Sequence, residues 1–111
     1  MPRPTLFICR RCETDSGDED ESGEALYRAV KALRKARDLK PVFAVEGVKC
    51  LGWCDQACAV ELDGKKRSTY TRVHVSPQRD VAAVVAAACA YAALEPGHEL
   101  PERRLPGESA D

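Results

Sequence analysis

The chain has 111 residues; 44% of them are hydrophobic, 32% are charged and 5% are aromatic, and the formal net charge is -1. A chain of this length has room for one small core. The near-neutral charge argues against a nucleic-acid-binding protein, and the few aromatic side chains argue against a base-stacking platform. No apolar run approaches the roughly 20 residues of a membrane span, and the apolar run near the start is too short for a signal peptide. We therefore expect a cytoplasmic protein that binds neither nucleic acid nor membrane.

The first half of the chain predicts a strand, a helix and a second strand. Residues 5–8 form a short run that favours a strand. The acidic stretch 13–24 has few apolar anchors, which indicates either a solvated loop or a negative patch that steers a basic partner. Between residues 22 and 39, apolar side chains at spacings of three and four predict an amphipathic helix. Pro41 ends this helix, and residues 42–45 follow as the second strand.

The second half predicts a hairpin and a second helix. Residues 59–62 are a strand that ends at Asp63-Gly64, a strong hairpin signal. Residues 68–75 form its partner strand. Ser76-Pro77 is a favourable helix start, because a serine caps the first turn and a proline suits the first helical position. The helix is expected to run from residue 77 to residue 94.

These elements give the order β-α-β-β-β-α. This order is expected when a parallel first unit is followed by a hairpin and a covering helix, as in thioredoxin-like folds. We therefore predict an α/β fold with a single mixed sheet and two helices, in one domain that spans residues 1–94. The polar, proline-containing residues 95–111 are expected to form a flexible tail.

Six cysteines are the unusual feature of the composition. In the absence of a secretion signal, clustered cysteines indicate a metal or redox site instead of a disulfide framework. Cys9 ends the first strand, and Cys12 follows it in a C-x-x-C turn, in which two thiolates converge well enough to bind one metal ion. Cys50 and Cys54 form a second pair, and Cys58 repeats the same four-residue spacing.

Thiolates without a neighbouring histidine or carboxylate favour zinc or an iron–sulfur centre. The gap of 37 residues between Cys12 and Cys50 is typical of neither zinc knuckles nor zinc ribbons, but it is natural if two loops meet at one end of a sheet. A 2Fe-2S cluster would use one cysteine pair for each iron: Cys9 and Cys12 for one, Cys50 and Cys54 for the other. The spacing alone predicts a metal and leaves iron and zinc open.

The segment Cys50-Leu-Gly-Trp-Cys54-Asp-Gln-Ala-Cys58-Ala-Val-Glu-Leu-Asp-Gly64 resembles the second half of the cluster motif in thioredoxin-like 2Fe-2S ferredoxins and in the related subunit of respiratory NADH dehydrogenase. The chain is also similar to an uncharacterised bacterial family of predicted metal-binding proteins. That family combines C-x-x-C after the first strand with C-L-x-x-C-D-x-x-C and a G-K…T-Y segment, which Gly64-Lys65 and Thr69-Tyr70 match here. The resemblance covers roughly residues 5–94.

This resemblance implies a thioredoxin-like fold, a 2Fe-2S cofactor and a one-electron carrier or metal-handling protein. A carrier needs a redox partner protein, and thioredoxin-like ferredoxins tend to be dimers, so a homodimer is a further expectation. Those ferredoxins usually carry a proline at the position of Cys58, and their first two ligands are usually further apart. Five cysteines therefore compete for four ligand positions. We predict Cys9, Cys12, Cys50 and Cys54 as the ligands, with Cys58 as a neighbour or alternate ligand.

Two other functions stay open. A zinc-binding or metal-handling protein would use the same four thiolates. A thiol–disulfide oxidoreductase would use Cys9 and Cys12, since thioredoxin-like enzymes carry their nucleophile in a C-x-x-C after the first strand. The acidic stretch 13–24 argues against that enzyme, because nearby negative charge raises the pKa of a thiol. We therefore expect an electron-transfer or metal-binding protein that is not an enzyme by itself.

Two arginines near these motifs have two interpretations, and the sixth cysteine has one. Arg10 and Arg11, between the first two cysteines, would offset the negative charge of a cluster, or they are exposed loop residues. Cys89 lies on the apolar side of the last predicted helix, where a cysteine behaves as a small hydrophobic residue.

Overall fold

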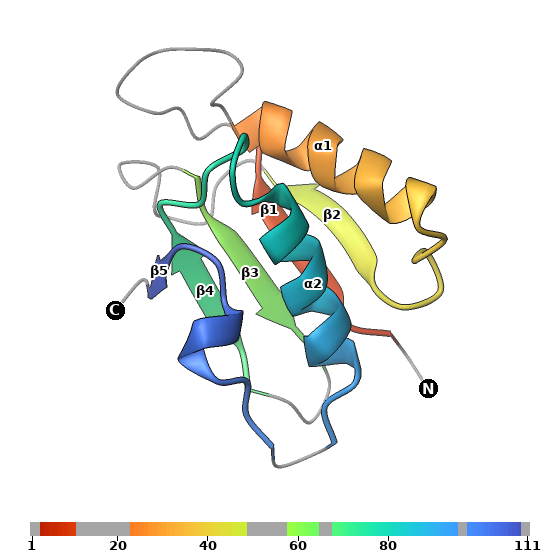
Figure 1. Ribbon diagram of the computed structural model, residues 1–111, viewed down its shortest axis with the longest axis vertical. Coiled ribbons are helices and arrows are strands. Elements are labelled where there is room, and N and C mark those ends of the chain that lie inside the picture. The colour runs from red at the N-terminus through yellow and green to blue at the C-terminus, as the bar shows by residue number, and fades with distance from the viewer. Residues whose placement is uncertain (1–2, 11–22, 49–57, 65–67, 96–97, 110–111) are drawn as a thin grey trace.

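The computed structural model describes residues 3–10, 23–48, 58–64, 68–95 and 98–109 (Figure 1). A five-stranded mixed sheet is covered on one face by two helices. In chain order the elements are β1 (Thr5–Cys9), α1 (Gly23–Ala36), β2 (Ala44–Val48), β3 (Val60–Asp63), β4 (Tyr70–Val73), α2 (Val81–Ala92), the 3-10 helix η3 (Glu102–Arg104) and β5 (Glu108–Ser109). The predicted order β-α-β-β-β-α and the single mixed sheet with two helices are confirmed.

The order of the strands across the sheet is β2-β1-β3-β4-β5. Strand β1 is central: it runs parallel to β2, with Cys9 opposite Val48, and antiparallel to β3, with Ile8 opposite Val60. The other two pairs of neighbouring strands are antiparallel. Because β1 and β2 are parallel, both end at the edge of the sheet where β3 begins.

The core lies between the sheet and the two helices. Side chains of a strand alternate between its faces, and Leu6 and Ile8 of β1 point into the core, where both are buried. On α1, the buried Leu26 and Val30 lie four positions apart on one face of the helix. Burial of one such aliphatic side chain contributes about 1.5–3 kcal/mol. The hydrophobic pattern of the sequence therefore determines which faces of β1 and α1 pack together.

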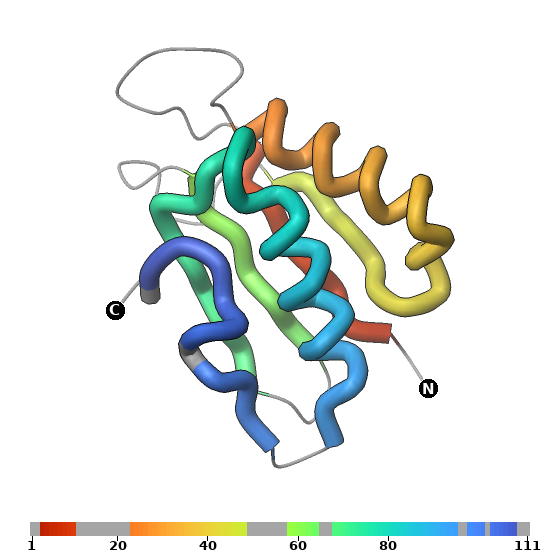
Figure 2. Tube along the Cα trace, in the orientation of Figure 1, coloured from red at the N-terminus to blue at the C-terminus, as the bar shows by residue number. Residues whose placement is uncertain are grey.

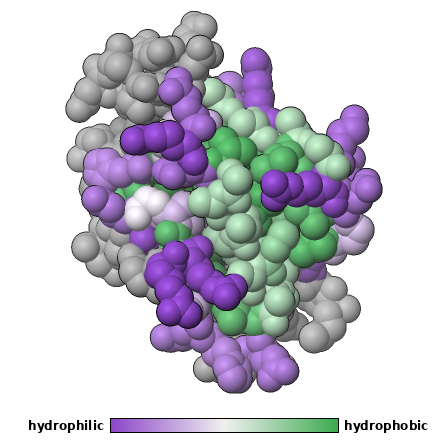
Figure 3. Space-filling model, viewed as in Figure 1, coloured by the Kyte–Doolittle hydropathy of each residue, from purple (hydrophilic) through white to green (hydrophobic). Residues whose placement is uncertain are grey.

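Helix α2 differs from α1 because its sequence is apolar on all sides. Its buried side includes Val84, Val85 and Tyr91. The outward side is formed largely by alanines, and the surface over this helix is pale green in Figure 3. No helix among the described residues is both long enough and apolar enough to cross a bilayer.

Among the element boundaries that differ from the prediction, two have a local hydrogen-bonding reason. Strand β2 begins at Ala44 and not at Val42, since the amides of Val42 and Phe43 both donate to the Leu39 carbonyl in a turn. Helix α2 begins at Val81 and not at residue 77. The Ser76 hydroxyl does accept backbone N–H bonds, but these come from Gln78 and Arg79 of the turn before the helix.

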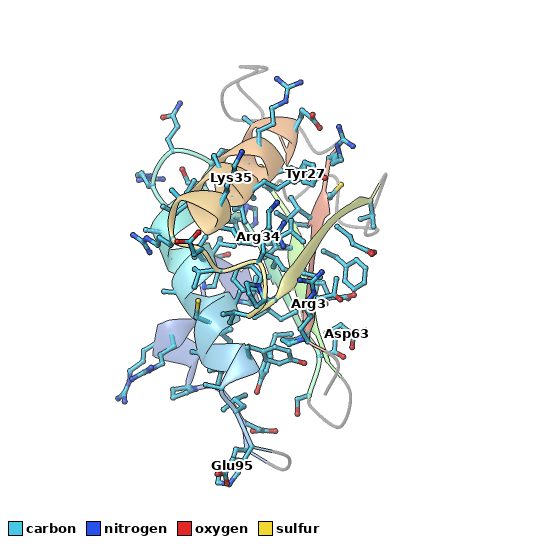
Figure 4. All side chains as sticks on the ribbon, turned by 90° about the vertical axis from the view of Figure 1, so that its right-hand side faces the viewer. Arg3, Tyr27, Arg34, Lys35, Asp63 and Glu95 are labelled. Atoms are coloured by element: carbon cyan, nitrogen blue, oxygen red, sulfur yellow. The ribbon has the colours of Figure 1, made fainter. Side chains whose placement is uncertain are left out.

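Arg34 is a buried charged residue of α1, with 8% of its surface exposed. It lies between the helix and the sheet, whereas its neighbour Lys35 is exposed on the outer side of α1 (Figure 4). Its Nη1 donates to the carbonyl of Phe43 at 3.0 Å. This bond fixes the connection from α1 to β2. It also explains why the Arg34 side chain points inward, whereas the side chain of Lys35 faces solvent.

Residues 98–109 pack against β4 (Figure 2), whereas the sequence predicts a flexible tail from residue 95. The guanidinium of Arg72, which is 3% exposed, donates from Nε to the Pro106 carbonyl at 2.8 Å and from Nη2 to the Gly107 carbonyl at 3.0 Å. The amide of Leu100 donates to the Tyr70 hydroxyl at 2.9 Å. Main-chain groups of the tail make these bonds, so its polar composition does not reveal them.

An Arg72→Met variant should lose about 2–3 kcal/mol of unfolding free energy in urea, because the carbonyls of the buried Pro106 and of Gly107 lose a charged donor. Limited proteolysis should then cut within residues 98–109. As a control, Arg103→Met removes the same charge from an exposed position of η3 and should change stability by no more than about 0.5 kcal/mol. Equal stability of the two variants would contradict the assigned role of Arg72.

Candidate metal centre

One edge of the sheet brings together the segments that carry the cysteines. Cys9 is the last residue of β1 and pairs with Val48, the last residue of β2. The amide of Cys9 donates to the carbonyl of Ala59 at 3.1 Å, so Cys58 lies at the same edge, just before β3. The parallel β1–β2 pair and the antiparallel β1–β3 pair together produce this arrangement. The end of β1, which carries Cys9, thus lies next to the described residues on either side of the second cysteine segment.

Of the four predicted ligands, the structure describes Cys9. Cys12, Cys50 and Cys54 lie outside the described residues. Within the part of the chain that is described, no three side chains of His, Cys, Asp or Glu lie close enough together to hold a metal ion. The described geometry therefore contains one predicted ligand and the two chain ends, Val48 and Cys58, that flank the second cysteine segment.

Cys9 and Cys58 are both fully buried but occupy different surroundings. Cys58 belongs to the hydrophobic core, together with Ile8 and Val60, and Cys9 is outside that cluster. Since Ile8 points toward the helices, the next residue of the strand points toward the opposite face of the sheet. The fifth cysteine therefore packs as a core residue, on the other side of the sheet from Cys9.

The pairing between β3 and β4 changes register next to Cys58. Val60 pairs with Arg72, whereas Cys58 exchanges two backbone hydrogen bonds with Val75, at 3.3 and 3.1 Å. The extra residue is His74, whose φ of 55° is in the left-handed region. One additional residue in one strand is a β-bulge, a feature that is frequent next to functional sites.

Arg10, the residue after Cys9, is held by a network on α1. Its amide continues the sheet by donating to the Val48 carbonyl at 2.9 Å. Its guanidinium forms a two-pronged ion pair with Glu24, with Nε–Oε2 and Nη2–Oε1 distances of 2.6 and 2.8 Å. The same guanidinium lies over the ring of Tyr27, 4.7 Å from the ring centre. Arg10 is thus an ordered residue whose charge lies beside the predicted metal site, although its side chain is 46% exposed.

Gly47 makes room for the Arg10 side chain. A Cβ atom at this position of β2 would overlap Cγ and Cδ of Arg10 and would lie 3.1 Å from the Tyr27 ring. Only a residue without a side chain lets the aliphatic part of Arg10 cross β2 at this point. The glycine of the strand therefore belongs to the arrangement that carries Arg10 from the end of β1 to α1.

Glu24 has a lowered pKa, first because it accepts hydrogen bonds from Arg10 and further because of the positive charges of Arg10 and Arg28. The pKa of Arg10 is raised in turn by its bond to Glu24. Arg28 approaches the same carboxylate from one turn along α1, at 3.1 Å. The negative charge of Glu24 is therefore balanced by Arg10 and Arg28. Residues 13–22 of the acidic stretch lie outside the described residues.

The contacts of Arg10 were not predicted from the sequence. The spacing of Glu24 and Arg28 is the i, i+4 spacing of helical ion pairs and indicates that part of the network. The pair between Arg10 and Glu24 depends on how α1 crosses the end of β1, which no local pattern contains. Cys89, by contrast, is a partly buried residue of α2 that packs against the core, as predicted, and burial raises the pKa of its thiol.

Comparison with known proteins identifies both the fold and the family. The family model described as "Protein of unknown function (DUF1636)" matches residues 6–108. A solved thioredoxin-like 2Fe-2S ferredoxin from Aquifex aeolicus is 16% identical, with a TM-score of 0.62 over 100% of this chain and 96% of that chain. A crystal structure of the wild-type form of such a ferredoxin from the same organism is 15% identical, with a TM-score of 0.65 over 96% and 97% of the two chains.

At these identities the likeness shows a shared thioredoxin-like ferredoxin fold. The predicted resemblance to thioredoxin-like ferredoxins and to an uncharacterised family is confirmed. No curated protein sequence matches the chain.

Proposed function

Because the chain belongs to the DUF1636 family of proteins of unknown function, we propose a function from the chain's own site. In this proposal the protein binds a 2Fe-2S cluster through Cys9, Cys12, Cys50 and Cys54 and carries single electrons to a protein partner. The observation that carries this proposal is the buried position of Cys9 at the edge where β2 ends and β3 begins.

Chain connectivity supports the choice of ligands. Cys12 is two residues beyond Arg10, and Cys50 is two residues beyond Val48. Successive Cα atoms are about 3.8 Å apart, so each of these cysteines is within about 8 Å of the described end of its strand. Those two ends are joined by the Arg10–Val48 hydrogen bond. The donor set also suits the cofactor, since it consists of soft thiolates.

The chain's own residues would set the surroundings of the bound group. A 2Fe-2S cluster supplies a one-electron redox couple, which protein side chains of this site lack. The complete burial of Cys9 excludes water from one ligand, and the adjacent positive charge of Arg10 would offset part of the negative charge of a bound cluster. The amides of Cys9 and Arg10 already donate to Ala59 and Val48, so hydrogen bonds to sulfur have to come from other groups.

The burial of Cys9 also argues against a thiol–disulfide oxidoreductase. A thiol–disulfide oxidoreductase needs an accessible nucleophile, and a fully buried Cys9 does not meet a disulfide of another protein without local opening. A zinc-binding or metal-handling protein would use the same four thiolates and is the second candidate.

As an electron carrier, the protein would act in the cytoplasm. It would need a partner enzyme to perform chemistry. A homodimer stays a prediction.

Protein purified without oxygen tests the proposal. We expect a coloured protein that absorbs visible light and contains about two irons per chain, with matching sulfide, as a 2Fe-2S centre requires. Colourless protein with one bound zinc would contradict the ferredoxin function and support the second candidate. Metal-free protein that cycles with thioredoxin reductase would support the oxidoreductase.

A further inference from the structure

The exposed face of α1 carries a row of cations that starts beside Cys9. Arg28, Lys31 and Lys35 are exposed and share one face of the helix, at spacings of three and four. Arg10 from the end of β1 extends the row. We call these four residues the basic stripe. The four side chains carry a formal charge of +4, and Glu24, which pairs with Arg10 and Arg28, contributes -1.

The structure holds the stripe in place near the candidate metal centre. Tyr27 is the shared contact: the Arg10 guanidinium lies 4.7 Å from its ring centre and the Lys31 ammonium lies 5.1 Å from it. Lys31 also donates to the Tyr27 hydroxyl at 3.3 Å. Cation–ring contacts restrain charged side chains that otherwise move freely in water. The side chain of Arg28 remains 78% exposed, so its charge is available to a partner.

From this arrangement we propose that the basic stripe is the docking surface for an acidic face of the protein that exchanges electrons with the centre. Complementary charge increases the rate of encounter and fixes the orientation of the two proteins. Arg10 follows Cys9 directly, so an acidic face bound at Arg10 and Arg28 lies next to the cysteine-bearing edge of the sheet. The role in electron exchange rests on the proposed function, whereas recognition of an acidic surface does not.

The contacts favour an acidic protein over two other partners. A single-stranded nucleic acid that stacks its bases on the protein would need a free aromatic face, but Tyr27, which lies within this surface, already contacts two cations. A basic partner would be repelled by the stripe, and Glu24 is already balanced by Arg10 and Arg28. The stripe ends at an open hollow of about 350 Å³ beside α1, lined by Lys35, Asp38, Lys40 and Pro41.

Fluorescence anisotropy with a labelled deca-glutamate peptide tests the docking surface. The protein should bind this peptide at low salt and release it at about 1 M salt, where the Debye length is about 3 Å. The double variant Arg28→Glu/Lys31→Glu should bind about tenfold more weakly or worse, since two attractive charges become repulsive. Arg28→Gln/Lys31→Gln should have an intermediate affinity, and this variant keeps the test valid if charge reversal perturbs the fold.

The matched control is Arg103→Glu/Arg104→Glu, which changes the net charge equally at exposed positions of η3. It should retain most of the affinity. Equal weakening in both double variants, or no binding at low salt, would overturn the proposal. So would tighter binding of deca-lysine, or tighter binding of a single-stranded RNA decamer that Tyr27→Leu abolishes. Iron content and the visible spectrum, measured on the same preparations, report on the proposed function independently of peptide binding.

Discussion

A Cys9→Ser variant, purified without oxygen, should lose the visible absorption and nearly all of the iron, from about two irons per chain to close to none. Serine is a harder and much weaker ligand than a thiolate. The position of Cys9 is also restricted, because its amide is bound to Ala59 and its strand pairs on both sides. Iron and sulfide analysis, together with the absorption spectrum, measure this result.

Cys58 provides the contrasting variant. Because Cys58 packs in the hydrophobic core, Cys58→Ser should retain its iron and lose about 1–3 kcal/mol of stability, the cost of a hydroxyl in an apolar site. Cys89→Ser, on α2, should retain the metal as well. Iron that is lost with Cys58→Ser and kept with Cys9→Ser would reverse the assignment of the fifth cysteine.

Gly23→Ala should destabilise the fold by about 1–3 kcal/mol or more, the usual cost of an overpacked contact. In a helix interior, alanine is more favourable than glycine by about 1 kcal/mol, so the sign expected for Gly23, the first residue of α1, is the opposite of that interior preference. The reason is that a Cβ atom on Gly23 would overlap the carbonyl oxygen of Cys9. The carbonyl oxygen belongs to the backbone and the backbone also fixes the position of a Cβ atom, so neither atom can turn away. Urea unfolding measures the change.

The same substitution should affect the centre, because α1 has to move away from the end of β1 that carries Cys9. We expect reduced iron content in Gly23→Ala in addition to lower stability. Ala32→Gly is the control: it exchanges the same two residue types at an exposed position of α1 and should cost only about 0.5–1 kcal/mol, with iron content unchanged. A Gly23→Ala protein as stable as the parent would show that the helix and strand tolerate the added atom.

Much of the fold was predictable because it depends on local pattern. The alternation of Leu6 and Ile8, and the four-residue spacing of Leu26 and Val30, correspond directly to buried faces. The position of Cys9 at the end of β1 follows from the apolar, strand-favouring run 5–8 that precedes it. The register was not predictable, since it requires knowing that Ile8 lies opposite Val60 and that His74 inserts a bulge.

Long-range polar contacts account for most of the remaining differences. Charged residues are expected at the surface, so neither the burial of Arg72 nor its bonds to the Pro106 and Gly107 carbonyls could be inferred from composition. The Arg10–Glu24 pair joins residues 14 positions apart in sequence and exists only because α1 begins at the end of β1. The predicted ligands Cys12, Cys50 and Cys54 lie outside the described residues, and their role stays a prediction.

The pairing of β5 with β4 also has a consequence for self-association. Unpaired backbone groups at a sheet edge are templates on which further strands add, and this leads to aggregation. Residues Glu108 and Ser109 cover part of the β4 edge, so within the described sheet β2 is the fully open outer strand. Strand β2 is short and carries the exposed charge of Glu46 together with Gly47, two features that disfavour the addition of another strand. The C-terminal segment thus protects the sheet from one side, and the composition of β2 protects it from the other.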